Sequence, residues 1–176
     1  MNKKLIIPSL ILILAVIGIA VDVYQSNLDK NSLNSPKTYS GDGISFKYPQ
    51  SWSAYKPLEK GEVVSVGDSG QKILLTVYKN KSTENSTETV ITNVKSNIGS
   101  DPLATNQTET NRTVNGLNAT EITYLSIDDG SPFKESVLTF KKDNFTYVIQ
   151  YHAFPPEAYN QNKKQFDLVI SSFKVQ

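Results

Sequence analysis

The serine of Gly67-Asp68-Ser69-Gly70 stands in a setting typical of the nucleophile of chymotrypsin-like proteases. Such a serine needs a histidine as general base and a carboxylate that orients the histidine. The only histidine, His152, follows this serine in the chain, whereas those proteases place it before the serine. A chain of this length is also too short for the two barrels of that fold. We therefore interpret residues 67–70 as a turn.

Metal and thiol chemistry have few candidate residues in this chain. The absence of cysteine excludes thiolate nucleophiles, disulfides and cysteine-bound metal sites. His152 alone makes a poor metal site unless folding brings carboxylates to it. Asp128 and Asp129 are adjacent carboxylates, but their spacing is not that of a calcium-binding EF-hand loop. We expect no cofactor, no metal and no catalytic set, although two carboxylates brought together by folding would leave hydrolysis open.

Aromatic residues near strand ends are better candidates for a binding site. Trp52 is the only tryptophan, and Tyr55 follows it closely. Such a pair can line a cleft, or Trp52 can close the core as an apolar lid. The second candidate is the turn-rich tract between two long predicted strands, which carries Asp128, Asp129 and Phe133. These five residues are the predicted ligand or partner site.

The segments that must position these residues follow an apolar N-terminus. Lys3-Lys4 precedes an uncharged run from Leu5 to Val21, whose 17 residues lie at the lower limit for spanning a bilayer. We predict that residues 1–24 are a signal-anchor in the cytoplasmic membrane. A cleaved signal peptide is the alternative, because Gly18-Ile19-Ala20 offers small residues for cleavage. Both interpretations place the C-terminal domain outside the cytoplasm, either anchored by a single span or secreted. Residues 25–42 are polar and are predicted to be a flexible stalk.

Alternating apolar residues predict strands from residue 43 onward. Ile44, Phe46 and Tyr48 alternate with polar residues until Pro49, which cannot continue a paired strand. Other runs rich in β-branched and aromatic residues predict strands over 62–66, 72–78, 133–140 and 145–151.

Asn115-Gly116 is the clearest turn signal in the chain. This pair is preferred in two-residue type I′ turns, so it predicts a hairpin between 108–114 and 117–127. The first arm is almost entirely polar, and we expect a solvated or edge strand. Six Asn-x-Ser/Thr sequons are potential N-glycosylation sites if the host glycosylates exported proteins. Their asparagines are Asn80, Asn85, Asn106, Asn111, Asn118 and Asn144.

Two amphipathic segments predict helices. One runs from a cap at Ser86 or Thr87 to about Ile98 and is ended by Gly99; the other spans 156–173. The predicted fold class is α+β, with an antiparallel sheet of about six or seven strands sandwiched by helices, preceded by the N-terminal transmembrane or signal helix. The predicted core consists of Phe46, Tyr48, Trp52, Ile73, Leu75, Ile122, Val148, Phe166, Val169 and Phe173.

The overall charge argues against nucleic acid as a partner. The formal net charge is +1, and Arg112 is the only arginine. A nucleic-acid-binding domain normally carries a clustered basic surface. We expect contact with a membrane through the N-terminus, together with a protein or small-molecule partner whose identity the sequence does not indicate.

Two segments resemble a known family. Ile44-Ser45-Phe46-Lys47-Tyr48-Pro49-Gln50-Ser51-Trp52 resembles the start of the PsbP/Mog1-like domain, whose first strand often reads aromatic-x-Tyr-Pro-x-x-Trp. Phe166-Asp167-Leu168-Val169-Ile170-Ser171-Ser172-Phe173 resembles the closing helix of that domain. The resemblance covers about 43–176 and looks most like the exported PsbP-related proteins of prokaryotes. It implies an antiparallel sheet between helices and no conserved catalytic set.

These observations favour a membrane-anchored extracytoplasmic accessory or binding protein that is not an enzyme. No segment of this sequence matches a photosystem-docking segment. We therefore do not infer a photosystem-docking role from the resemblance. Two alternatives remain open at this point: an exported hydrolase that uses carboxylates, and a glycosylated structural protein of the cell envelope. Fold resemblance alone does not decide between them.

Overall fold

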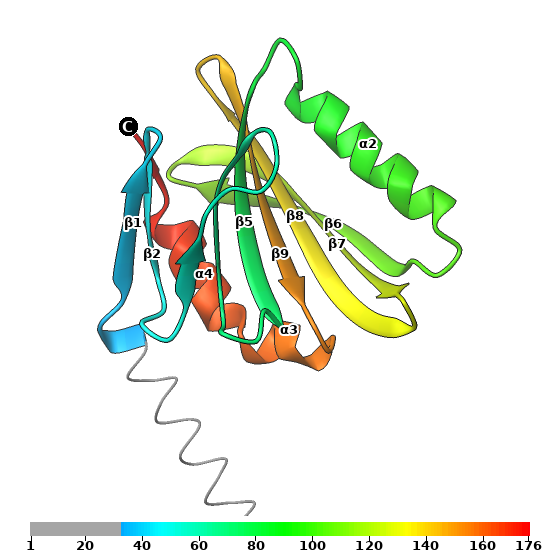
Figure 1. Cartoon of the computed structure of the whole chain (residues 1–176). Coiled ribbons are helices and arrows are strands. Elements are labelled where there is room, and N and C mark those ends of the chain that lie inside the picture. Colours follow the sequence, from blue (N-terminus) through cyan, green and yellow to red (C-terminus); the bar gives the residue numbers. More distant parts are fainter. Residues whose placement is uncertain (1–32) are drawn as a thin grey trace, which may run out of the picture.

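The computed structural model describes residues 33–176 (Figure 1). The predicted signal-anchor or signal peptide at 1–24 lies outside the described residues, as does the first part of the predicted stalk. Within residues 33–176, none of the helices has the length and apolar character needed to cross a bilayer.

A seven-stranded sheet forms the centre of the molecule, and all its neighbouring strands are antiparallel. This agrees with the predicted six or seven antiparallel strands. The type I′ hairpin is also confirmed, because Asn115 and Gly116 have φ of 50° and 77°. In spatial order the strands are β3 (Ser53–Tyr55), β4 (Glu62–Gly67), β5 (Ile73–Lys81), β9 (Phe145–Ala153), β8 (Ser131–Lys142), β7 (Leu117–Asp128) and β6 (Thr105–Val114).

A second, three-stranded sheet joins the two ends of the described chain. It contains β1 (Lys37–Gly41), β2 (Ile44–Tyr48) and β10 (Lys174–Val175). Residues 37–41 fall within the predicted stalk, so ordered structure begins earlier than the polar composition suggested. The physical reason is Tyr39, whose ring stacks on Phe46 with centroids 5.3 Å apart. The Tyr39 ring thus adds an apolar contact to the antiparallel pairing of β1 with β2, which runs from Lys37 to Gly41.

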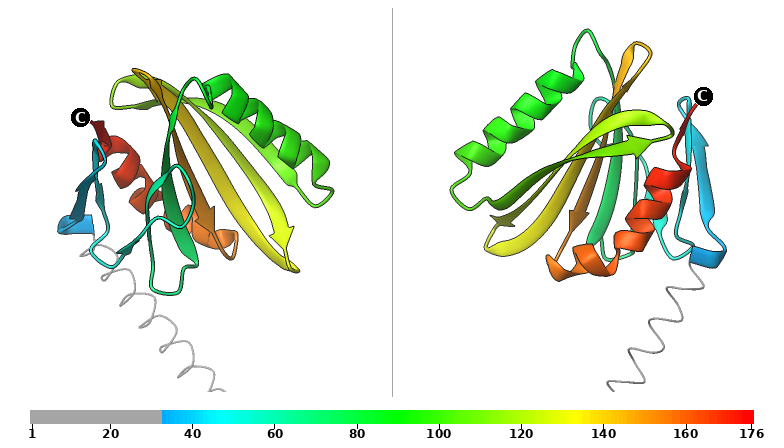
Figure 2. Two further views of the ribbon diagram at one scale, coloured as in Figure 1. Left: turned by 45° about the horizontal axis from the view of Figure 1, so that its top comes forward. Right: turned by 180° about the vertical axis from the view of Figure 1, so that it is seen from behind.

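The helices lie on opposite faces of the large sheet (Figure 2). Phe166 of α4 (Lys163–Ser172) stacks on Tyr151 of β9, with ring centroids 4.7 Å apart. Val148 and Gln150 of the same strand instead face α2 (Thr87–Ser100). Since successive strand residues point to opposite faces, α4 and α2 cover different sides of the sheet.

The predicted helix over 156–173 is two helices. A short helix, α3 (Glu157–Gln161), ends at Asn162, and α4 begins directly after it. Both the backbone N–H and the side-chain amide of Asn162 donate to the Ala158 carbonyl oxygen at 3.0 Å. Asn162 therefore ends α3, while its own carbonyl accepts the first bonds of α4 from Gln165 and Phe166. At α2 the predicted cap is confirmed, because Ser86 Oγ accepts from the Thr89 N–H at 3.1 Å.

The main core lies between the large sheet, α4 and β2. Eight of the ten predicted core residues belong to this cluster. Ile122 and Val148 are also buried, at 1% and 9% exposure, but they belong to the opposite, α2-covered face, where Val148 lines the groove and Ile122 pairs with Val137. The prediction of a single shared core was wrong for these two residues, because hydrophobicity alone does not tell which face of a two-sided sheet a residue occupies.

Candidate functional site

A row of polar side chains crosses the face of the large sheet on which α2 lies. Register pairs Tyr55 with Ser65, Ser65 with Thr76, and Thr76 with Gln150. Directly opposed residues in a sheet share a face, so this row runs from β3 to the centre of the sheet. Ser65 and Thr76 are buried, and their hydroxyls lie 2.8 Å apart. The face thus carries polar groups where the opposite face carries the main core.

A groove of about 320 Å³ lies between α2 and this face, and we call it the α2 groove. That volume is at the lower end of the range typical of small-molecule sites. Apolar side chains from both sides of the groove form much of its lining: Val90, Val94 and Ile98 from α2, and Phe133, Val137 and Val148 from the sheet. The polar lining residues are Asn97, Asp101, Tyr124, Glu135 and Gln150.

Glu135 is the central polar residue of the α2 groove, and it is only 7% exposed. Its Oε1 accepts hydrogen bonds from the Tyr124 hydroxyl at 2.7 Å and from Gln150 Nε2 at 2.9 Å. His152 Nδ1 lies 3.4 Å from the other oxygen, Oε2. Burial raises the pKa of the Tyr124 hydroxyl, and the charges of Glu135 and Asp101 raise it further. Tyr124 therefore remains a neutral donor to Glu135.

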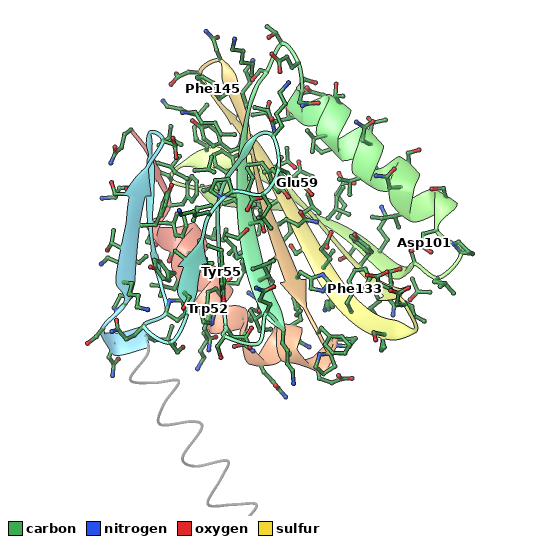
Figure 3. All side chains as sticks on the ribbon, in the orientation of Figure 1. Trp52, Tyr55, Glu59, Asp101, Phe133 and Phe145 are labelled. Atoms are coloured by element: carbon green, nitrogen blue, oxygen red, sulfur yellow. The ribbon has the colours of Figure 1, made fainter. Side chains whose placement is uncertain are left out.

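Asp101 lies at the C-terminal end of α2, where it is the capping residue (Figure 3). Its Oδ2 accepts a hydrogen bond from the buried Ser126 hydroxyl, and its Oδ1 accepts from the Leu103 N–H at 2.9 Å. The hydrogen bond from Ser126, followed by that from Leu103, lowers the pKa of the Asp101 carboxyl. The end of α2 is thereby fixed to β7 through an ionised group.

A second pocket, of about 290 Å³, lies at the other end of the polar row. Tyr55, Leu58, Glu62 and Ser65 line it. Tyr55 is held there by its hydroxyl, which donates to the Asp68 carbonyl oxygen at 3.0 Å. Because Tyr55 and Gln150 belong to the same row, this pocket and the α2 groove open on the same face of the sheet.

The structure separates the five site residues predicted from the sequence. Tyr55 lines the second pocket and Phe133 lines the α2 groove. Trp52 is 3% exposed and belongs to the main core. Asp128 and Asp129 are exposed at the turn between β7 and β8, where Asp129 has a positive φ of 46°. Of the predicted tract 128–133, Phe133 lines the α2 groove, whereas Asp128 and Asp129 line neither this groove nor the second pocket.

His152 and the serine motif both have structural partners. The His152 ring packs against Phe133 with centroids 4.7 Å apart, beside Glu135. Residues 67–70 form the predicted turn: the Asp68 N–H donates to the Ile73 carbonyl oxygen at 3.1 Å, and Asp68 Oδ1 accepts from the Ile73 N–H at 2.9 Å. Within residues 33–176, no group of three or more acidic or histidine side chains is arranged to hold a metal ion.

All five polar residues of the α2 groove were missed in the sequence: Asn97, Asp101, Tyr124, Glu135 and Gln150. One signal was available for Glu135. It occupies an apolar register in β8, between Phe133 and Val137, where a buried side chain is expected. A charged residue in such a position needs a partner or a function.

A second buried carboxylate lies on the opposite face of the sheet. Glu121 is 8% exposed, and the Arg112 guanidinium binds it at 3.3 Å. The Ser136 hydroxyl donates to the same carboxylate at 2.6 Å. Arg112 also binds Asp167 of α4 at 2.8 Å. The two faces thus each bury one glutamate, but only Glu121 has an arginine partner in the described structure.

The sequons differ in exposure. Asn80 and Asn85 are half-buried, whereas Asn106, Asn111, Asn118 and Asn144 are exposed. Three of the exposed asparagines lie on the β6–β7 hairpin, and β6 is the edge strand that its polar sequence predicted. Glycosylation at these positions stays a prediction.

Comparison with solved structures finds this fold in proteins of diverse origin. The PsbP protein of Synechocystis sp. PCC 6803 is 20% identical and has a TM-score of 0.54; the match covers 81% of this chain and 93% of that chain. LpqN of Mycobacterium tuberculosis, which is involved in cell envelope biogenesis, is 11% identical, with a TM-score of 0.59 and coverage of 81% and 90%. The Ran-binding protein Mog1p of Saccharomyces cerevisiae is 10% identical, with a TM-score of 0.53 and coverage of 80% and 95%.

Sequence comparisons add the family assignment. No curated protein matches this sequence. The profile of the PsbP-like protein family, however, matches residues 5–175, which is nearly the whole sequence. The resemblance seen in the first strand and the last helix is thereby confirmed, and the chain belongs to the PsbP-like protein family.

Proposed function

We propose that this chain is a membrane-anchored extracytoplasmic binding or accessory protein without catalytic activity, and that it holds its ligand or partner in the α2 groove. The observation that carries the proposal is the groove itself, in which an apolar wall from α2 faces the buried carboxylate of Glu135. Binding sites typically combine such apolar walls with a few positioned polar groups. The anchoring rests on Lys3-Lys4 and the uncharged run Leu5–Val21.

The hydrogen bonds in the groove favour binding over catalysis. Both oxygens of Asp101 accept hydrogen bonds from the protein, and Glu135 accepts from Tyr124 and Gln150. A general acid needs a carboxyl that is protonated near neutral pH. The lowered pKa of Asp101 works against that role. Carboxylates fixed in this way are suited to recognising a ligand in one orientation.

A carboxylate-based hydrolase is the second candidate, because Asp101 and Glu135 line the same groove. Such an enzyme would cleave a nitrophenyl glycoside or ester, and Glu135→Gln would abolish turnover while the protein stays folded. A binding protein would show no release of nitrophenol above the Glu135→Gln background. This assay separates the two candidates without knowledge of the natural ligand.

Site-specific photo-crosslinking in the native membrane tests the binding proposal. The photoreactive amino acid p-benzoylphenylalanine replaces Asn97, an exposed residue that lines the α2 groove. The matched control places it at Lys164, which is exposed on α4 at the other side of the sheet. We expect a discrete adduct at position 97 that is absent at position 164. No adduct at 97, or the same products at both positions, would contradict a binding site in this groove.

A further inference from the structure

The α2 groove has an excess of negative charge. Two of its lining residues, Asp101 and Glu135, are carboxylates, and the described lining residues include no lysine or arginine. Charges act more strongly in a partly closed, apolar site than in water. The groove also meets the C-terminal end of α2, where the helix dipole places partial negative charge. The last turn of α2 contains no basic residue to offset it.

Comparison of the two buried glutamates shows that, among the described residues, Glu135 has no arginine partner of the kind that Glu121 has. Glu121 and Glu135 are equally buried, at 8% and 7% exposure. Glu121 is paired with Arg112, whereas the hydrogen-bond donors to Glu135 are the neutral Tyr124 hydroxyl and Gln150 amide. His152 Nδ1, at 3.4 Å, is the most distant of the three contacts of Glu135, and it is a cation only when protonated. A buried carboxylate without a permanent cation is costly, and a cationic ligand would remove that cost.

The surroundings of Glu135 indicate what the rest of such a ligand looks like. The rings of Tyr124 and Phe133 meet edge to face beside the carboxylate, with centroids 6.2 Å apart. Aromatic faces attract cations, especially organic ammonium groups. Val90 and Val94 of α2 supply an apolar wall for the remainder of the ligand.

Carboxylate charges also act on two tyrosine hydroxyls of this region, in addition to the larger effect of burial. Burial raises the pKa of Tyr78, and the charges of Glu59, Glu62 and Glu135 raise it further. Burial likewise raises the pKa of Tyr124, followed by the charges of Glu135 and Asp101. Burial disfavours a charge of either sign, whereas the charge of Glu135, which acts on both tyrosines, opposes a phenolate anion and favours a cation.

We propose that the α2 groove binds a small organic cation, whose ammonium group lies between Glu135, Tyr124 and Phe133 and whose apolar body packs against α2. This inference rests on the proposed function, because it names the ligand class for the same groove. The α2 groove is complementary to such a cation in two respects. It has a negative, aromatic end for the ammonium group and an apolar wall for the body of the ligand.

Three probes with the same phenyl body test the role of charge: protonated 2-phenylethylamine, neutral 2-phenylethanol and anionic 3-phenylpropanoate. The full chain is kept in a neutral detergent, and valine methyl NMR shifts report binding at Val90 and Val94. We expect the amine to bind at least about tenfold more tightly than the alcohol, and the acid to bind most weakly. Equal or tighter binding of the alcohol or the acid overturns the inference, as does the absence of shifts at these valines.

Substitutions then assign the preference to named carboxylates. Glu135→Gln should lower the affinity for the amine at least about tenfold and leave the affinity for the alcohol unchanged. Asp101→Asn, at the end of α2, should reduce the preference for the amine as well, and it serves if Glu135→Gln does not fold. The control Asp143→Asn, exposed at the β8–β9 turn, should change neither affinity. Preserved preference for the amine in the groove variants overturns the inference.

The outcomes also separate this inference from the proposed function. If the alcohol binds in the groove as tightly as the amine, the groove remains a binding site but the cation is the wrong ligand class. If crosslinking at position 97 gives no adduct in the native membrane, the proposed function fails whatever the probes do in vitro.

Discussion

Arg112 Nη2 donates to Asp167 Oδ1 at 2.8 Å, so the β6–β7 hairpin and helix α4 are joined by residues 55 positions apart in the chain. The same guanidinium binds the buried Glu121 and lies over the Phe166 ring, 5.5 Å from its centroid. One side chain thus neutralises a buried carboxylate and covers an aromatic ring of the main core.

Arg112→Met should lower the free energy of unfolding by about 3–5 kcal/mol, because it leaves Glu121 buried without a cation. The double variant Arg112→Met/Glu121→Met should recover most of this loss, since replacing both partners by apolar residues is often neutral. The matched control is Lys95→Met. The side chains of Lys95 and its ion-pair partner Glu109 are each 44% exposed, so this pair is worth at most about 1 kcal/mol. Urea unfolding measures the change in the free energy of unfolding for all three variants. Equal losses for Arg112→Met and Lys95→Met would contradict the buried ion pair.

Ser126→Ala should change how the free energy of unfolding depends on pH. In the folded protein the hydrogen bond from Ser126 lowers the pKa of the Asp101 carboxyl below its ordinary value of 3.8. The ionised carboxylate therefore contributes stability above about pH 4, and this contribution is lost as the pH falls through the lowered folded-state pKa. Without the Ser126 hydroxyl, the pKa of Asp101 should rise towards its ordinary value, and the loss of stability below about pH 4 should become shallower.

Carboxyl NMR titration of Asp101, together with urea unfolding at about pH 5 and pH 2.5, measures both effects. Asp167 also has a lowered pKa, despite an opposing contribution from burial, because Lys163 and Arg112 bind it. Its effect is common to wild type and variant, so the difference between them isolates Asp101. Ser171→Ala is the control, because that exposed hydroxyl donates only to the Leu168 carbonyl within its own helix. An unchanged Asp101 titration in Ser126→Ala would remove the proposed link between α2 and β7.

Phe166→Ala should lower the free energy of unfolding by about 3–5 kcal/mol, the usual range for a buried phenylalanine. Phe166 is 1% exposed and stacks on Tyr151 with an interplanar angle of 8°. Removing the ring would leave a cavity between α4 and the sheet and would also remove the contact of the ring with the Arg112 guanidinium. Lys164→Ala, an exposed position on α4, is the control with a small expected effect. A melting temperature of Phe166→Ala close to that of wild type would show that this face of α4 is not part of the core.

Local patterns in the sequence predicted the elements of the sheet well. Ile44, Phe46 and Tyr48 alternate with polar residues, and they are buried in β2 as expected. The Asn115-Gly116 turn depends on two positive φ values that few other residue pairs accept, so it also was predictable. Both features are set by residues within one element or one turn.

The candidate site was less predictable because it depends on pairing between distant strands. Tyr124, Glu135 and Gln150 converge only through the registers of β7 with β8 and of β8 with β9. Trp52 and Tyr55 show a different error. They are close in sequence, but Trp52 follows the turn closed by its bond to Pro49 and packs in the core, whereas Tyr55 belongs to β3 and lines the second pocket.

We predict that the N-terminal segment is retained in the mature protein as a membrane anchor. The uncharged run Leu5–Val21 is longer than a usual signal-peptide core of about 7–15 residues, and Lys3-Lys4 favours a cytoplasmic N-terminus. N-terminal sequencing of the protein from isolated membranes should therefore find the original start, and protease added to intact cells should digest the C-terminal domain. A mature N-terminus at Val21 or later would mean that the protein is released.

Gly67→Ala and Gly70→Ala should have opposite effects, although both glycines belong to the motif Gly67-Asp68-Ser69-Gly70. A Cβ at position 67 would overlap the Ile73 carbonyl oxygen, a backbone atom that already accepts the Asp68 N–H and cannot rotate away. A Cβ at position 70 would meet its nearest neighbour, Asp68 Oδ2, at an ordinary 3.5 Å, and φ there is not in the left-handed region.

Gly67→Ala should therefore cost about 1–3 kcal/mol in the free energy of unfolding, the usual range for overpacking. Gly70→Ala should be neutral or should stabilise by about 0.4–1 kcal/mol, because alanine restricts the unfolded chain without strain in the folded one. Urea unfolding of the two variants decides the matter. A result in which both cost the same would mean that the motif is needed for something other than the close contact between β4 and β5.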